Sequence, residues 1–250
     1  MGLESDLRKE VSEIMAWNFK VSQEKAIPSR DDLTLGKTAH EFTTAVLYAD
    51  VRKSSHIPEA HRDQTAAKIF NAFLNGAVRI CKQHNGFVRS FNGDSILVFF
   101  DPNNSPENVS TQAVLSALGI GAFSIKIMKP ATNKYGINFG VGVGVSFGKI
   151  FATKVGIRGE DNNDIIWPCT ATNLAAKMGD VATYPYSIII GKEVYNALPE
   201  HLKWRYPKAI FLKRPYWVEA DFGFAGSKIN VWKTNMANDW DIDGGKLVGN

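Results

Sequence analysis

Cysteine is scarce in this sequence, and long apolar runs are missing. The 250 residues include two cysteines, Cys81 and Cys169, which are too few and too far apart for a disulfide framework or a zinc site. We therefore expect a reducing compartment, the cytoplasm. No stretch approaches the roughly 18 uninterrupted apolar residues of a membrane span, and the first residues lack the apolar core of a signal peptide. We expect no membrane partner.

A large excess of one charge is also absent. The 29 basic and 25 acidic side chains give a net charge of +4, far short of the clustered excess that nucleic-acid-binding proteins carry. We therefore expect no nucleic-acid partner, although an anionic ligand is compatible with this charge. The hydrophobic share of 44% is ordinary for a globular protein and allows a sizeable core.

The apolar pattern divides the chain into three parts. Residues 1–40 hold an amphipathic helical pattern and a polar lead-in, residues 41–235 form one domain, and residues 236–250 are a polar tail. Glycines at 140, 142, 144 and 148 alternate with apolar residues, which is typical of strands packed closely against another backbone.

The pattern predicts an α+β fold for this domain, with antiparallel hairpins and helices packed on a sheet. The predicted strands are 42–51, the hairpins 86–100 and 137–155, and the later strands 187–190 and 229–232. The predicted helices are 59–83, 109–128 and 170–180.

Two aspartates stand at ends of these strands. Asp50 ends the apolar run that starts at Ala45, and Asp94 follows the Asn92-Gly93 pair, which is a strong hairpin signal because both residues tolerate positive φ. A carboxylate at the end of a buried strand, beside one at a hairpin tip, can hold two divalent ions over a triphosphate.

Three blocks resemble the catalytic domain of the class III nucleotidyl cyclases: Val46 to Arg52, Gly86 to Phe100, and Gly140 to Met178. The resemblance covers about residues 42 to 235, with the blocks in the family's order. It implies a ferredoxin-like antiparallel or mixed sheet and a head-to-tail homodimer with active sites at the interface. It also implies that a nucleoside triphosphate is converted to a 3′,5′-cyclic nucleotide and pyrophosphate.

The resemblance assigns metal ligands. Asp50 and Asp94 match the two aspartates that bind two Mg²⁺ or Mn²⁺ ions in the family, and Val51 is assigned to the same metal site. One ion activates the ribose 3′-hydroxyl for attack on the α-phosphate, and the other holds the β- and γ-phosphates.

The same comparison assigns three catalytic residues. Arg158 matches a phosphate-binding arginine, and Asn173 matches the asparagine that orients the ribose and α-phosphate; a guanidinium binds phosphate bidentately, and an amide both donates and accepts. Lys177 stands where the family usually has a transition-state arginine. Lysine keeps the positive charge of this arginine but lacks its planar guanidinium, which can donate two hydrogen bonds to one phosphate.

Further residues are assigned to substrate binding. Lys228 is a candidate lysine for the γ-phosphate. Ser54 and Ser55 stand where Phe-Thr is common, in the turn whose backbone amides cradle phosphates.

The base-reading positions differ from those of purine cyclases. Ser90 replaces the usual Lys or Glu. Ile166, or Ile165 or Trp167 after a shift of one, replaces the usual Asp or Cys. Tyr48 lies two residues before Asp50, on the same strand face. A pocket of this kind suits a pyrimidine and resembles the cyclases of bacterial Pycsar antiphage systems, which signal to a separate effector protein.

We favour UTP over CTP as the substrate, although Ser and Tyr hydroxyls can donate or accept a hydrogen bond and so can bind either base. The open alternatives are a cytidylate cyclase, a purine cyclase with an atypical pocket, and a nucleotide-binding module without turnover. Lys177 favours the last alternative, whereas the presence of both metal aspartates speaks against it.

Overall fold

A computed structural model describes residues 2–159, 162–205, 213–243 and 246–247. Its centre is a 9-stranded mixed sheet in the order β10-β11-β7-β5-β2-β4-β3, with β1 paired to β2 and β6 paired to β5. The strands of this sheet are β1 Lys20–Gln23, β2 Thr38–Val51, β3 Gly86–Asn92, β4 Ser95–Phe100, β5 Val141–Gly156, β6 Asn163–Ile166, β7 Ile188–Gly191, β10 Val218–Phe224 and β11 Ser227–Thr234.

Eight α-helices accompany the sheet in the described part of the chain. They are α1 Leu3–Met15, α2 His56–Ala60, α3 Asp63–Gln83, α4 Pro106–Phe123, α5 Lys129–Asn133, α6 Thr170–Val181, α7 Lys192–Ala197 and α8 Glu200–Lys203, with a π-helical turn Ser124–Met128 joining α4 to α5. Two small ladders complete the fold: β8 Trp204–Arg205 with β9 Arg214–Pro215, and β12 Trp240–Asp241 with β13 Lys246–Leu247. The expected α+β class is confirmed.

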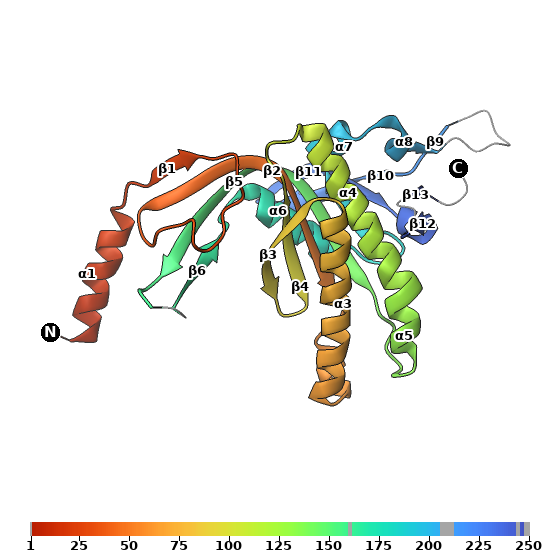
Figure 1. Cartoon of the computed structure of the whole chain (residues 1–250), viewed down its shortest axis with the longest axis horizontal. Coiled ribbons are helices and arrows are strands. Elements are labelled where there is room, and N and C mark those ends of the chain that lie inside the picture. The colour runs from red at the N-terminus through yellow and green to blue at the C-terminus, as the bar shows by residue number, and fades with distance from the viewer. Residues whose placement is uncertain (1, 160–161, 206–212, 244–245, 248–250) are drawn as a thin grey trace.

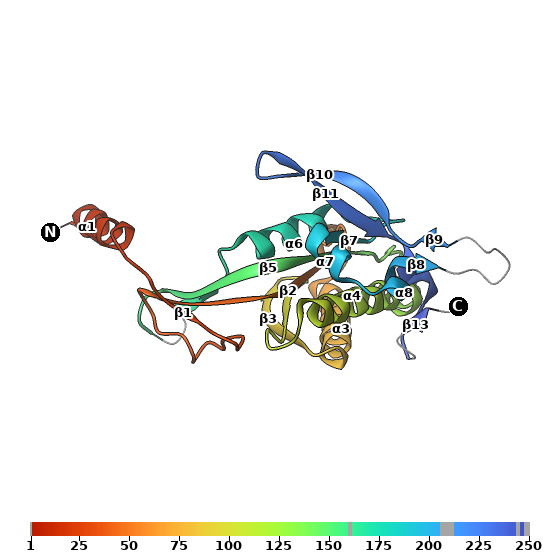
Figure 2. The ribbon, with the colours of Figure 1, turned by 90° about the horizontal axis from the view of Figure 1, so that it is seen from above.

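Helices cover both faces of the sheet, with α3 and α4 on one face and α6 on the other (Figures 1 and 2). Side chains alternate between faces along a strand. In β2, Ala45 and Leu47 belong to the core beneath α3 and α4, whereas Phe42 and Val46 pack in a second cluster with Ala175 of α6. By the same alternation, Asp50 faces the side that α6 covers.

The long helical stretch from Pro106 to Asn133 is apolar enough to cross a membrane by length and composition alone. Within its apolar window, however, 67% of the residues are buried inside the fold. Leu118 and Ile120, for example, are fully buried in the main core. Burial against the domain's own sheet is therefore sufficient to account for this apolar composition.

The segment predicted as a hairpin over 137–155 is instead one continuous strand, β5. It pairs antiparallel with β2 from Ala39↔Thr153 to Val51↔Val141. The alternating glycines do not form a turn, because α6 lies directly on them: a Cβ on Gly144 would lie 2.0 Å from the carbonyl oxygen of Ala175. The prediction of close backbone packing is confirmed, and the prediction of a hairpin is wrong.

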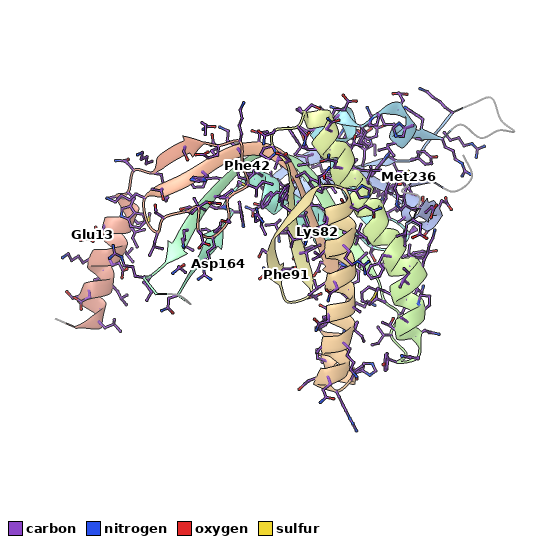
Figure 3. All side chains as sticks on the ribbon, in the orientation of Figure 1. Glu13, Phe42, Lys82, Phe91, Asp164 and Met236 are labelled. Carbon is purple, nitrogen blue, oxygen red and sulfur yellow. The ribbon has the colours of Figure 1, made fainter. Side chains whose placement is uncertain are left out.

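The two ends of the chain differ in burial. Helix α1 has no buried residue, and its side chains, including Glu13, project from a helix at one end of the molecule (Figure 3). At the other end, Met236 and Trp240 are buried in the main core, so this part of the expected polar tail packs on the domain. Residues 244–245 and 248–250 of that tail lie outside the described residues.

Candidate active site

Strand pairing brings the two aspartates together. Asp50 lies next to the end of β2 and pairs across the ladder with Ser95 at the start of β4. Asp94 directly precedes Ser95, after a turn in which Gly93 has a φ of +62°. Glycine adopts this left-handed conformation without steric cost. The hairpin predicted at Asn92-Gly93 therefore places the second carboxylate beside the first.

The environment of Asp50 favours its neutral form. Burial and the negative charge of Asp94 together raise the pKa of Asp50 to about 6, although the positive charge of Arg52 opposes both effects. The Oδ2 atom of Asp94 is buried and has no hydrogen-bond partner among the described residues. Two adjacent carboxylates with an unsatisfied oxygen are the arrangement that a bound cation would stabilise.

The donor set fits a hard divalent cation. Carboxylate and carbonyl oxygens are the ligands that Mg²⁺ and Mn²⁺ prefer. The Val51 side chain is buried in the main core, so this residue can offer a metal only its backbone carbonyl. Among the described residues no group of three or more His, Cys, Asp or Glu side chains could hold a metal. Substrate phosphates and water would therefore complete the coordination.

Arg52 connects this site to helix α6. Its Nη2 atom lies 2.7 Å from Oδ2 of Asp50, and its Nη1 donates a hydrogen bond to the backbone carbonyl of Asp180, near the end of α6. The sequence analysis assigned no role to Arg52. Its position two residues after Asp50, and so on the same strand face, is the signal that could have indicated one.

Tyr48 lies on the same face of β2 as Asp50. Burial raises the pKa of its hydroxyl, and the nearby Ser95 side chain opposes this rise. The ring packs on α6, since a Cβ on Gly179 would lie 2.9 Å from Cδ1 of Tyr48. Tyr48 is therefore held beside the metal candidates. Ser95 is a second residue that the sequence analysis missed.

The predicted catalytic residues of α6 point away from the sheet. Asn173 and Lys177 are exposed, whereas Ala175 and Met178 of the same helix are buried. Arg158, just beyond the end of β5, is also exposed. In the described part of this single chain, no hydrogen bond or ion pair joins these three residues to Asp50 or Asp94.

Lys228 lies in a different region, at the hairpin of β10 and β11. Its ammonium is 3.8 Å from the carboxylate of Asp221. It lines an open cavity of about 780 Å³ between this hairpin, β5 and the start of α6, together with Lys149 and Lys192. The described residues lining the cavity do not include Asp50 or Asp94.

The predicted base-reading residues are spread over the sheet. Ser90 is half-buried beside a bulge in β3, and Ile166 on β6 is 42% exposed. Trp167, the alternative base-reading position, is buried. Its ring centroid lies 4.5 Å from that of Phe99, because this large apolar ring gains more by packing in the second core cluster than by facing solvent.

Ser54 and Ser55 form the turn between β2 and α2. The amide of His56 donates to the carbonyl of Lys53, and the amide of Ile57 donates to the carbonyl of Ser54. Lys53 has a φ of 56°, which lets the chain turn back immediately after the end of β2 that carries Asp50. The turn therefore begins within three residues of Asp50.

Comparison with known proteins identifies the family. No family model matches the chain. It is 31% identical to a uridylate cyclase of Burkholderia cepacia over 209 residues, covering 82% of this chain and 88% of the relative. It is 28% identical to a uridylate cyclase of Xanthomonas perforans over 221 residues, covering 85% and 91%.

Solved structures share the fold. The adenylyl cyclase CyaB from P. aeruginosa matches 78% of this chain and 95% of its own, with a TM-score of 0.62 and 17% identity. The guanylyl cyclase Cya2 matches 78% and 92%, with a TM-score of 0.63 and 17% identity. Together with the curated relatives, these matches show that the chain belongs to the uridylate cyclase family of class III nucleotidyl cyclases and is a nucleotidyl cyclase.

Proposed function

We propose that this enzyme converts UTP to 3′,5′-cyclic UMP and pyrophosphate with two divalent metal ions, Mn²⁺ or Mg²⁺. The observation that carries the proposal is the pairing of Asp50 with Asp94, whose buried Oδ2 has no protein partner among the described residues. The curated relatives named uridylate cyclase support UTP as the nucleotide.

Bound metal would supply charge neutralisation for the triphosphate and a lower pKa for the ribose 3′-hydroxyl. Asp50 and Asp94 would hold it with the backbone carbonyl of Val51. Since the reaction needs little covalent chemistry from the protein, the remaining residues act by positioning the substrate and stabilising negative charge.

Asn173, Lys177 and Arg158 fit such roles in a homodimer. Asn173 and Lys177 are four residues apart on one exposed face of α6, so a single ligand can touch both. The exposed amide of Asn173 and the exposed ammonium of Lys177 do not contact the aspartates of their own chain. They are therefore free to bind a substrate held by the aspartates of a partner protomer. We propose that each active site combines Asp50 and Asp94 of one protomer with Asn173 and Lys177 of its partner.

Substrate recognition is assigned to residues around these groups. Backbone amides of the Ser54–Ser55 turn would bind phosphate near Asp50, Arg158 would bind phosphate from its exposed loop, and Lys228 would reach the γ-phosphate. Tyr48 and Ser90 carry hydroxyls that suit a pyrimidine edge, and Ile166 offers an apolar wall. Trp167 supports that wall from the core, where it packs on Phe99.

We further propose a cytoplasmic second-messenger role in antiphage defence, with cyclic UMP acting on a separate effector protein that the cyclase does not bind directly. The support is the resemblance to Pycsar cyclases.

Incubation of the purified protein with ATP, GTP, CTP and UTP in separate reactions with Mn²⁺, followed by mass identification, tests the substrate. Cyclic UMP from UTP as the main product supports the proposal. Cyclic CMP as the main product would move the assignment to CTP, and a cyclic purine nucleotide would show that Ser90 and Ile166 do not exclude purines. No product from any of the four would contradict UTP cyclisation by this protein.

A further inference from the structure

The Arg52 guanidinium binds two groups on different elements. It pairs with Oδ2 of Asp50 at 2.7 Å and donates to the backbone carbonyl of Asp180 in the last turn of α6. The Arg52 and Asp50 side chains are 21% and 23% exposed, so solvent screens their interaction only in part. One side chain thus joins the metal-binding strand to the helix that carries Asn173 and Lys177.

The neighbouring backbone leaves room for this link. Gly142 on β5 pairs with Asp50 across the sheet. A Cβ on Gly142 would lie 3.0 Å from Cζ of Arg52 and 2.3 Å from the carbonyl oxygen of Gly179. The amide of Arg52 also donates to the carbonyl of Gly140 at 2.9 Å. Any side chain at 142 would therefore displace the guanidinium or the end of α6.

The charges around Arg52 explain why an arginine suits this place. The carbonyls at the end of a helix carry partial negative charge, and the carboxylates of Asp94 and Asp180 both act on Asp50. A guanidinium is always charged and its planar fork serves two acceptors at once. A lysine would carry the charge, but its single ammonium favours one acceptor over the other.

We propose that Arg52 is a positioning residue that couples the two halves of the catalytic machinery within one protomer, holding Asp50 and the C-terminal turn of α6 in a fixed relation. This inference rests on the proposed homodimer. There, Asp50 serves one active site while Asn173 and Lys177 of the same chain serve the other. Each active site therefore depends on the Arg52 of both protomers.

The first test needs neither substrate nor turnover. In metal-free protein, Arg52→Ala is expected to speed hydrogen exchange in the last turn of α6, including the amide of Ala182, which bonds to Met178. It is also expected to tighten Mn²⁺ binding by about threefold or more, because the guanidinium no longer competes for Oδ2 of Asp50. Arg79→Ala, at an exposed position of α3, is the matched control.

The second test uses mixed dimers of Asp50→Asn and Asn173→Ala protomers, which contain one complete active site. Arg52→Ala is added to the Asp50→Asn protomer, whose own metal site is already inactive but whose α6 serves the working site. We expect turnover to fall by roughly tenfold or more, the range measured for residues that orient catalytic groups. The Mn²⁺ dependence should stay unchanged, because the working metal site keeps its own Arg52.

Arg52→Lys separates the contact with Asp50 from the contact with the carbonyl of Asp180. It should keep Mn²⁺ affinity near that of the unmodified protein while lowering turnover in the same mixed dimer, because one ammonium cannot hold both acceptors. Unchanged exchange at the end of α6 in Arg52→Ala, or unchanged turnover of the mixed dimer, would overturn the coupling.

Failure of the Arg52 link and failure of the proposed function give different results in these experiments. If Asp50→Asn and Asn173→Ala protomers give no activity on mixing, the shared site is wrong, and hydrogen exchange with Mn²⁺ affinity still decides whether Arg52 links Asp50 to α6. If the unmodified protein makes a different cyclic nucleotide, the same variants are assayed with that nucleotide.

Discussion

Asp94, in the turn of the β3–β4 hairpin, lies beside Asp50 of β2, and its negative charge adds to burial in raising the pKa of Asp50 to about 6. A neighbouring carboxylate opposes the ionisation of Asp50. In the absence of metal this arrangement costs stability, and a divalent cation would relieve that cost.

Asp50→Asn should stabilise the metal-free protein at high pH. The folded state holds the Asp50 proton more tightly than the unfolded chain, whose value is near 3.8, so ionisation lowers stability as pH rises from about 4 to above 6. At pH 8 the variant should gain about 1 to 2 kcal/mol in free energy of unfolding. At pH 4 the gain should vanish. Denaturant unfolding in EDTA measures both, and a loss of stability at pH 8 would contradict the assignment.

Metal should stabilise the native protein in a pH-dependent way. At pH 8, Mn²⁺ at 100 times its dissociation constant should add about 2.7 kcal/mol. The effect should shrink below pH 6, where a proton on Asp50 competes with the cation. Asp94→Asn should abolish the Mn²⁺ shift and turnover together while leaving the metal-free protein folded. A full Mn²⁺ shift in Asp94→Asn would remove Asp94 from the metal site.

Gly144→Ala should disrupt the packing of α6 on the sheet. The added Cβ would lie 2.0 Å from the carbonyl oxygen of Ala175 and 2.6 Å from the amide nitrogen of Gly179, both backbone atoms. We expect a loss of about 3 kcal/mol in free energy of unfolding. Gly223→Ala on β10 is the control, because a Cβ there meets nothing within 4 Å. Equal stabilities of the two variants would show that α6 can move away at little cost.

Lys177 should act on the transition state rather than on substrate binding. Lys177→Ala is expected to lower kcat by about 100-fold with a small change in KM, as for other groups that stabilise developing charge. Lys177→Arg should keep most of the rate, since it retains the charge and adds the fork. Lys82→Ala, at an exposed lysine of α3 labelled in Figure 3, is the control. Steady-state kinetics would contradict the role if Lys177→Ala changed KM alone.

Tyr48 should contribute to base selection through its hydroxyl. Tyr48→Phe keeps the ring that packs on Gly179 but removes the hydroxyl that lies near Ser95. We expect kcat/KM for UTP to fall by about tenfold or more, because a buried polar site is left unpaired. Activity with ATP and GTP should not fall in parallel. An equal loss for all four nucleotides would make Tyr48 a structural residue.

The sequence predicts the elements around Asp50 and Asp94 well, because the signals are local. The strand before Asp50 is predicted by its own apolar run, and the turn is predicted by the Asn92-Gly93 pair. The β3–β4 hairpin forms where expected. The continuous strand β5 was not predicted, since its course depends on thirteen residue pairs with β2, a segment distant in sequence. The burial of Trp167 was not predicted for the same reason, because its partners Phe42 and Phe99 come from β2 and β4.

A competition assay measures which nucleotide the enzyme prefers and whether turnover requires Asp94. The protein is given ATP, GTP, CTP and UTP together at equal concentrations with Mn²⁺, with Asp94→Asn assayed in parallel, and both cyclic nucleotides and pyrophosphate are quantified. We predict cyclic UMP as the main product, one pyrophosphate for each cyclic nucleotide, and no product from Asp94→Asn. A purine product in excess, or undiminished product from Asp94→Asn, would contradict it.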